Sequence, residues 1–206
     1  MRSPADFHQE HRLWKQGFKQ VAGIDEVGRG AWAGPMVAAA VVFPPFFDTP
    51  FELFDSKLLL PKQREMISEK IKEVAAIGIG LVDVTTINNF GIRQATQKTF
   101  KKAIKALKLQ TDYYLIDAFY IQGWKKDKQL PIKRGDQTCA SIAAASIIAK
   151  VYRDNLMKNL GNKYSEYGFG QHKGYGTRIH QEAIAKYKFS DIHRTSFNIA
   201  RYLNGR

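Results

Sequence analysis

The sequence predicts an α/β protein built on one mixed β-sheet. An apolar run, a glycine-rich break and a second apolar run follow one another between residues 20 and 43, and this pattern predicts two strands joined by a tight turn. Further along, short apolar runs of strand length alternate with longer runs of helical spacing. The predicted order is a three-strand meander with one inserted helix, followed by helix, strand, strand and helix. Such a chain forms a sheet with an antiparallel half and a parallel half.

The first half of the chain contains the predicted meander. Residues 1–20 read as a polar leader that holds a short helix. The first strand ends at Asp25, and the second extends from Met36 to Phe43. A proline-rich irregular stretch then leads to a helix over residues 61–75, in which apolar residues recur at helical spacing. The alternating run of residues 77–84 predicts the third strand.

The second half predicts two more strands between helices. A helix begins at Asn88 or Asn89, either of which could cap it, and continues to about Lys108. Residues 113–116 form a compact apolar strand that ends in Asp117, and a short strand follows at residues 130–133. A long helix rich in small residues covers about 138–160 and is stopped by Gly161. Two C-terminal helices are predicted at about 177–186 and 195–204.

The length and composition are those of one globular domain, or of one domain with a small appendage. The chain has 206 residues, of which 44% are hydrophobic and 25% charged, which are ordinary values for a soluble protein. No apolar run approaches the length of a membrane span, and the polar N-terminus does not predict secretion. The single cysteine, Cys139, excludes an internal disulfide and a cysteine-based zinc site. We therefore expect a cytoplasmic protein with no membrane partner.

The net charge predicts a polyanionic partner. Lysine and arginine number 32 against 19 aspartates and glutamates, which gives a net charge of +13. Nucleic acid is the first candidate and an anionic membrane surface the second, while a generally basic proteome is the plain alternative. The aromatic content of 12% favours nucleic acid, because aromatic rings stack on bases and sugars.

Four acidic residues stand at the ends of predicted elements, and they are Asp25, Glu26, Asp117 and Asp136. Each has an ordinary explanation: Asp136 could cap a helix, Asp117 could be a turn residue, and the Asp-Glu pair could be a solvated corner. If the three segments converge, however, the carboxylates would repel one another unless a cation lay among them. Hard oxygen ligands of this kind select Mg²⁺ or Mn²⁺.

The segment Asp25-Glu26-Val27-Gly28-Arg29-Gly30, followed by Ala33-Gly34-Pro35, resembles the opening motif of the type 2 ribonucleases H, specifically ribonuclease HII. The likeness extends from about Val21 to Phe197. Ile116-Asp117 and Gly135-Asp136 match two further family elements, with Arg134 where the family has lysine and Ala118 where it often has glycine.

The resemblance implies a ribonuclease H-like fold, a five-stranded mixed sheet flanked by helices, with a C-terminal helical extension. We divide the chain accordingly into the leader 1–20, the catalytic domain 21–160 and the extension 161–206, all in one compact unit. In this fold the first strand is central and parallel to the fourth, which would bring Asp25 beside Asp117. The four acids would then hold two divalent cations, with Asp25 bridging them, for hydrolysis that leaves 5′-phosphate and 3′-hydroxyl ends.

The implied substrates are RNA/DNA hybrids and duplex DNA with a single embedded ribonucleotide, cut on its 5′ side. Recognition must reach the 2′-hydroxyl, and in the family the Gly-Arg-Gly loop does this. Read alone, Gly-x-Gly is only a turn, Tyr175 a loop aromatic, and the Lys/Arg pair of the long helix a solvated face. The resemblance assigns substrate contacts to Gly28, Arg29, Gly30, Ser56, Lys57, Ser146, Lys150, Arg153 and Tyr175.

The alternative to an enzyme is a catalytically silent nucleic-acid-binding module, which would share the charge and the aromatics but would not need four intact acids. A zinc protease is excluded because the sequence has no His-Glu-x-x-His motif, and a serine hydrolase is disfavoured because it has no Gly-x-Ser-x-Gly elbow. We expect a monomer that acts in repair of misincorporated ribonucleotides and in removal of RNA primers.

Overall fold

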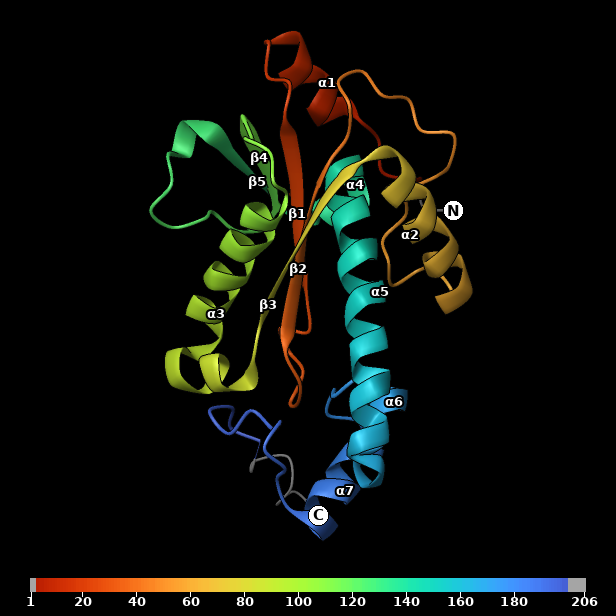
Figure 1. Cartoon of the computed structure of the whole chain (residues 1–206), viewed down its shortest axis with the longest axis vertical. Coiled ribbons are helices and arrows are strands. Elements are labelled where there is room, and N and C mark those ends of the chain that lie inside the picture. Colours follow the sequence, from red (N-terminus) through yellow and green to blue (C-terminus); the bar gives the residue numbers. More distant parts are fainter. Residues whose placement is uncertain (1–2, 200–206) are drawn as a thin grey trace.

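The fold is a five-stranded sheet with helices on both faces, as Figure 1 shows for the computed structural model of the chain, which describes residues 3–199. The strand order is β3-β2-β1-β4-β5, with β1 in the centre. Strands β1, β2 and β3 are antiparallel neighbours, whereas β4 runs parallel to β1, and β5 parallel to β4. The predicted mixed sheet is confirmed. The strands are β1 (Val21–Val27), β2 (Met36–Val42), β3 (Ala76–Val82), β4 (Tyr113–Asp117) and β5 (Gln129–Ile132).

Two helical layers cover the sheet. Helix α3 packs on one face, and α5 packs on the other together with α1 and α2 (Figure 1). Two separate apolar clusters result, because alternate residues of a strand point to opposite faces. The helices are α1 (His8–Lys15), α2 (Pro61–Val74), α3 (Val84–Ala106), α4 (Gly135–Thr138), α5 (Ala140–Lys163), α6 (Phe169–His172) and α7 (Arg178–Tyr187), with short 3₁₀ turns η1 (Lys126–Lys128) and η2 (Ser165–Tyr167).

Small residues let α5 lie almost in contact with the central strand. A Cβ atom on Gly23 of β1 would stand only 2.1 Å from the main-chain carbon of Ser141. The first ten residues of α5 are Ala, Ser and Ile, and all ten are buried. The small-residue helix that the sequence predicts therefore lies close against the sheet, and it carries Ser146 and Lys150 to the carboxyl end of β1.

The N-terminal residues are part of the core. Phe7, Leu13 and Trp14 are buried in the cluster on the α5 face. The buried Glu10 accepts hydrogen bonds from the Ser141 main-chain nitrogen at 2.7 Å and from Cys139 Sγ at 3.1 Å. Its carboxylate thus caps the start of α5, where the helix dipole favours negative charge. The sequence interpretation of residues 1–20 as a polar leader did not anticipate this cap.

Three helix boundaries differ from prediction. Helix α3 begins at Val84 rather than Asn88 or Asn89, because Asp83 caps it by accepting from Thr86 N at 2.7 Å, and the chain kinks at Gly91. Gly161 does not stop α5 but lies inside it, where a Cβ would meet Gly170 N at 2.6 Å. Residues 195–199 form turns rather than the start of the predicted helix 195–204, and residues 200–204 lie outside the described part of the chain.

Candidate active site

Three distant segments bring the four predicted acids to one cavity at the carboxyl ends of the central strands. Asp25 and Glu26 lie near the end of β1, Asp117 ends the parallel neighbour β4, and Asp136 lies in α4, four residues beyond the end of β5. The cavity has a volume of about 470 Å³. Every predicted site residue except Arg153 lines it, namely Asp25, Glu26, Gly28, Arg29, Gly30, Ser56, Lys57, Asp117, Asp136, Ser146, Lys150 and Tyr175.

The carboxylates carry a high electrostatic cost. Burial, and then repulsion from Glu26 and Asp117, raise the pKa of Asp25 well above its usual value, although a bond to the Ser146 hydroxyl opposes the rise. Burial raises the pKa of Glu26 to about 7 against the lowering effect of Arg29, and its Oε2 atom is buried without a hydrogen-bond partner. Burial also raises the pKa of Asp117. The site therefore gathers carboxyl groups whose charges the neighbouring cations only partly compensate.

The acids do not form a ready-made cage. Asp25 and Glu26 are consecutive in a strand and so point to opposite faces of the sheet. Asp117 Oδ1 accepts from Gly135 N at 2.8 Å, and Asp136 Oδ2 accepts from Lys57 Nζ at 3.1 Å. Within residues 3–199, no group of three or more His, Cys, Asp or Glu side chains is already arranged to hold a metal ion.

Two of the residues predicted to contact substrate, Ser56 and Ser146, stabilise the cavity wall. Ser56 and Ser146 are buried and share a hydrogen bond of 3.0 Å between their hydroxyls, which links the loop before α2 to α5. Lys150, one turn further along α5, donates to Asp154 at 2.7 Å and still lines the cavity. The Asp55-Ser56-Lys57 element is therefore held against the long helix beside the acids.

Arg153 does not face solvent, contrary to the prediction that it contacts phosphate. Its side chain is fully buried, and its guanidinium donates to the carbonyl oxygens of Pro35 at 2.9 Å, Lys173 at 2.9 Å and Ala33 at 3.3 Å. Gly28 has φ +91°, and a Cβ there would stand 2.1 Å from Arg153 Nε. Arg153 therefore packs beneath the Gly-Arg-Gly loop and holds the main chain around it.

A second buried arginine, Arg194, supports the same loop and was not predicted. It donates to Arg29 O at 3.0 Å and twice to Gly34 O, at 2.9 and 3.1 Å. Burial and then the charge of Arg153 lower its pKa to about 9. A lone arginine near the end of a basic chain gives no sequence signal of such a role, because its partners are main-chain carbonyls 160 residues or more away.

A chain of hydrogen bonds through two histidines reaches the main chain of Tyr175. Ser190 N donates to His193 Nδ1 at 2.9 Å, so the proton of His193 lies on Nε2 and is donated to His180 Nε2 at 3.0 Å. His180 Nδ1 then donates to the Tyr175 carbonyl at 3.0 Å. Burial lowers the pKa of both histidines to about 4. Both histidines are neutral at neutral pH, as this series of hydrogen bonds requires. The sequence analysis did not predict this histidine pair.

The sheet order and the acid-lined cavity at the ends of β1 and β4 place this chain in the ribonuclease H-like class. The ribonuclease HII family model matches residues 22–200, and the chain belongs to the ribonuclease HII family. It is therefore an enzyme that hydrolyses phosphodiester bonds of RNA. This assignment argues against the alternative of a catalytically silent nucleic-acid-binding module.

Named relatives agree with this assignment. A ribonuclease HII of Roseiflexus castenholzii is 45% identical over 200 residues, which cover 95% of this chain and 89% of the relative. One of Clostridioides difficile is 48% identical over 190 residues, 91% of this chain and 73% of the relative. The crystal structure of ribonuclease H2 from Pyrococcus horikoshii superposes with a TM-score of 0.73 at 25% identity, over 89% of this chain and 96% of that one.

Proposed function

We propose that this enzyme cleaves the RNA strand of RNA/DNA hybrids and cuts duplex DNA on the 5′ side of a single embedded ribonucleotide. One observation carries the proposal: four acids from three segments share a cavity with the Gly-Arg-Gly loop and Tyr175. The acids supply the hydrolytic chemistry and the loop with Tyr175 supplies the choice of sugar. The products carry 5′-phosphate and 3′-hydroxyl ends.

The residues of the cavity fit divalent cations. Glu26 Oε2 is buried without a partner, and burial and mutual repulsion raise the pKa values of Asp25, Glu26 and Asp117, so a cation would relieve an existing electrostatic cost. The donors are hard oxygens, which suit Mg²⁺ and Mn²⁺. Asp25, Glu26, Asp117 and Asp136 would hold two such ions. When bound, the ions would activate water and stabilise the leaving oxygen.

The residues around the acids would bind and orient the substrate. Gly30 is exposed, and a Cβ on it would meet nothing within 4 Å, so the loop main chain is open to close approach by a sugar. Lys57 has a side chain 74% exposed and lies beside Asp136, where its ammonium group would meet a phosphate. Tyr175, anchored through its carbonyl by His180, would pack on the next sugar and select deoxyribose.

The cellular setting is part of the proposal. No helix in the described part of the chain has the length and apolar character needed to cross a membrane. Cys139 is a free, buried thiol, which suits a reducing compartment. We place the enzyme in the cytoplasm as a monomer, acting in ribonucleotide excision repair and in primer removal during DNA replication.

The decisive experiment is cleavage of duplex DNA that bears one ribonucleotide, with Mg²⁺ or Mn²⁺ and the cut mapped to the nucleotide. We expect one cut on the 5′ side, none with EDTA, and none in the all-DNA duplex. Asp25→Asn should reduce cleavage to the EDTA background, whereas Asp48→Asn, the same change at an exposed position outside the cavity, should not. Equal cutting of the all-DNA duplex would refute the proposal that the enzyme recognises the ribose. Full activity of Asp25→Asn would refute the proposal that the four acids carry the hydrolysis.

A further inference from the structure

A second hollow adjoins the acid-lined cavity on the α3 face of the sheet. It lies between α3 and the loop after β4, has a volume of about 350 Å³, and is lined by Arg29, Arg93, Gln97, Phe119 and Tyr120 among others. Arg29 lines both hollows. The loop that forms one wall follows Asp117 directly, and Phe119 N in this loop donates to the Asp117 carbonyl at 2.7 Å. A polymer bound at the acids would therefore meet this hollow next.

The lining combines cations with aromatic faces. The Arg29 guanidinium lies 4.4 Å from the centre of the Phe119 ring, and Lys126, which does not line the hollow, places its Nζ 5.9 Å from the centre of the Tyr120 ring. Arg93 is exposed, Tyr120 is 46% exposed, and no acidic residue in the described part of the chain lines the hollow. Arginines beside open aromatic rings suit a phosphate backbone whose bases or sugars stack on those rings. Because two arginines and no acid line this hollow, it suits a polyanion better than an apolar or cationic ligand.

Two hydrogen bonds hold the hollow in shape. Gln97 Nε2 donates to the Tyr120 carbonyl at 3.0 Å, and Gln97 Oε1 accepts from Gln122 N at 2.7 Å. These two bonds fasten the loop to α3. Its walls are therefore already in place, so binding does not have to order them first.

The hollow and Tyr175 lie towards opposite layers of the molecule. Tyr175 stands near Arg153 of α5, at 5.6 Å from guanidinium to ring centre, whereas the hollow is built on α3. Helices α3 and α5 cover opposite faces of the sheet (Figure 1). If the nucleotide on the 3′ side of the ribonucleotide packs on Tyr175, the 5′ part of the same nucleic-acid strand would extend over Arg29 towards α3.

We propose that this hollow is a substrate subsite that binds the sugar-phosphate backbone on the 5′ side of the cut. The inference rests on the proposed function for the direction of the strand. Arg93 would contact one phosphate, and Tyr120 would stack on the adjoining nucleotide. Affinity should therefore depend on how far the cut strand extends on its 5′ side.

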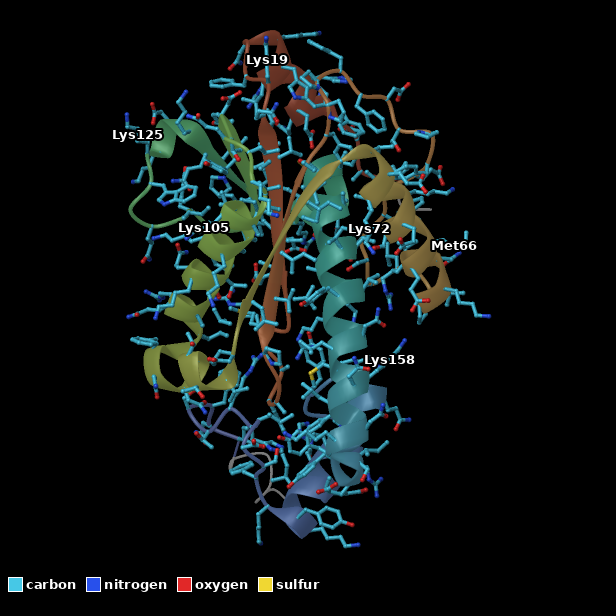
Figure 2. The ribbon with its side chains drawn as sticks, viewed as in Figure 1. Lys19, Met66, Lys72, Lys105, Lys125 and Lys158 are labelled. Carbon is cyan, nitrogen blue, oxygen red and sulfur yellow. The ribbon has the colours of Figure 1, made fainter. Side chains whose placement is uncertain are left out.

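The test measures how tightly variants of the Asp25→Asn protein bind duplexes with a single ribonucleotide. Arg93→Ala should weaken binding about tenfold and reduce the slope of log affinity against log salt by about 1, as loss of one phosphate contact does. Tyr120→Ser should weaken binding without changing that slope. Lys105→Ala is the matched control, because Lys105 is exposed on the same helix (Figure 2), about 18 Å further along it, and should change neither quantity.

Two series of duplexes, shortened one nucleotide at a time on either side of the ribonucleotide, test the direction. The difference in affinity between the Asp25→Asn protein and the same protein carrying Arg93→Ala should vanish once the 5′ side is too short to reach the hollow. It should persist when only the 3′ side is shortened. The inference is overturned if Arg93→Ala binds like the Lys105→Ala control, or if its defect follows the 3′ side. Failure of the proposed function has a different signature, since the wild-type enzyme would then leave all ribonucleotide-containing duplexes uncut.

Discussion

Replacement of Gly23 by alanine should separate α5 from the central strand. The new Cβ would stand 2.1 Å from the main-chain carbon of Ser141 and 2.5 Å from the nitrogen of Ile142, and ordinary contact begins at 3.4 Å. The helix must therefore retreat by about 1.3 Å at this point. Neither neighbour is a side-chain tip that could rotate away, so the strain cannot be relieved locally. Overpacking of a core costs about 1–3 kcal/mol, and we expect the upper end of that range.

The assay is thermal unfolding followed by cleavage kinetics. A loss of about 3 kcal/mol lowers Tm by about 6–12 °C in a chain of this size. Because α5 also carries Ser146 and Lys150 into the cavity, cleavage should fall even at temperatures where the variant is folded. Gly170→Ala is the control, since its Cβ would meet only Lys158 Cα, at 3.9 Å, and its stability should stay within about 0.5 kcal/mol of the wild type. A Tm for Gly23→Ala equal to that of this control would refute the reasoning.

Three further predictions concern pH, charge and the thiol. The pKa of His180 and of His193 is about 4 in the folded chain against an ordinary 6.5, so the unfolded chain binds more protons below pH 6.5. Stability should therefore be full above pH 6.5 and fall towards pH 4, by up to about 3 kcal/mol for each histidine. The stability of His193→Asn should depend less on acid pH, and an unchanged dependence would contradict the assignment. Lys57→Met should weaken hybrid binding yet alter stability by less than about 1 kcal/mol, because the Lys57 side chain of its ion pair with Asp136 is 74% exposed. Chemical denaturation and a binding titration measure the two effects, and a larger loss of stability would contradict this prediction. Burial raises the pKa of the Cys139 thiol well above its usual value, so alkylation followed by mass spectrometry should modify it only in denaturant, and rapid reaction of the native protein would disprove its burial.

The sequence by itself determined the elements that local pattern controls. Apolar periodicity placed the five strands and the helices that flank them, apart from their ends, and acids at strand ends marked Asp25, Glu26 and Asp117 as candidate site residues. The motif around Gly28 then identified the family. These features can be predicted from the sequence because each depends on residues close together in the chain, or on a motif that rarely occurs by chance.

Tertiary structure decided which polar groups are buried and what they hold. Glu10 looks like part of a polar leader, yet it caps a helix that begins 130 residues later. Arg153 has the spacing of a phosphate ligand, but the turn at Gly28 leaves room for its guanidinium beneath the loop, where main-chain carbonyls take its hydrogen bonds. A single sequence does not record such pairs, because donor and acceptor meet only when the sheet and α5 have packed together.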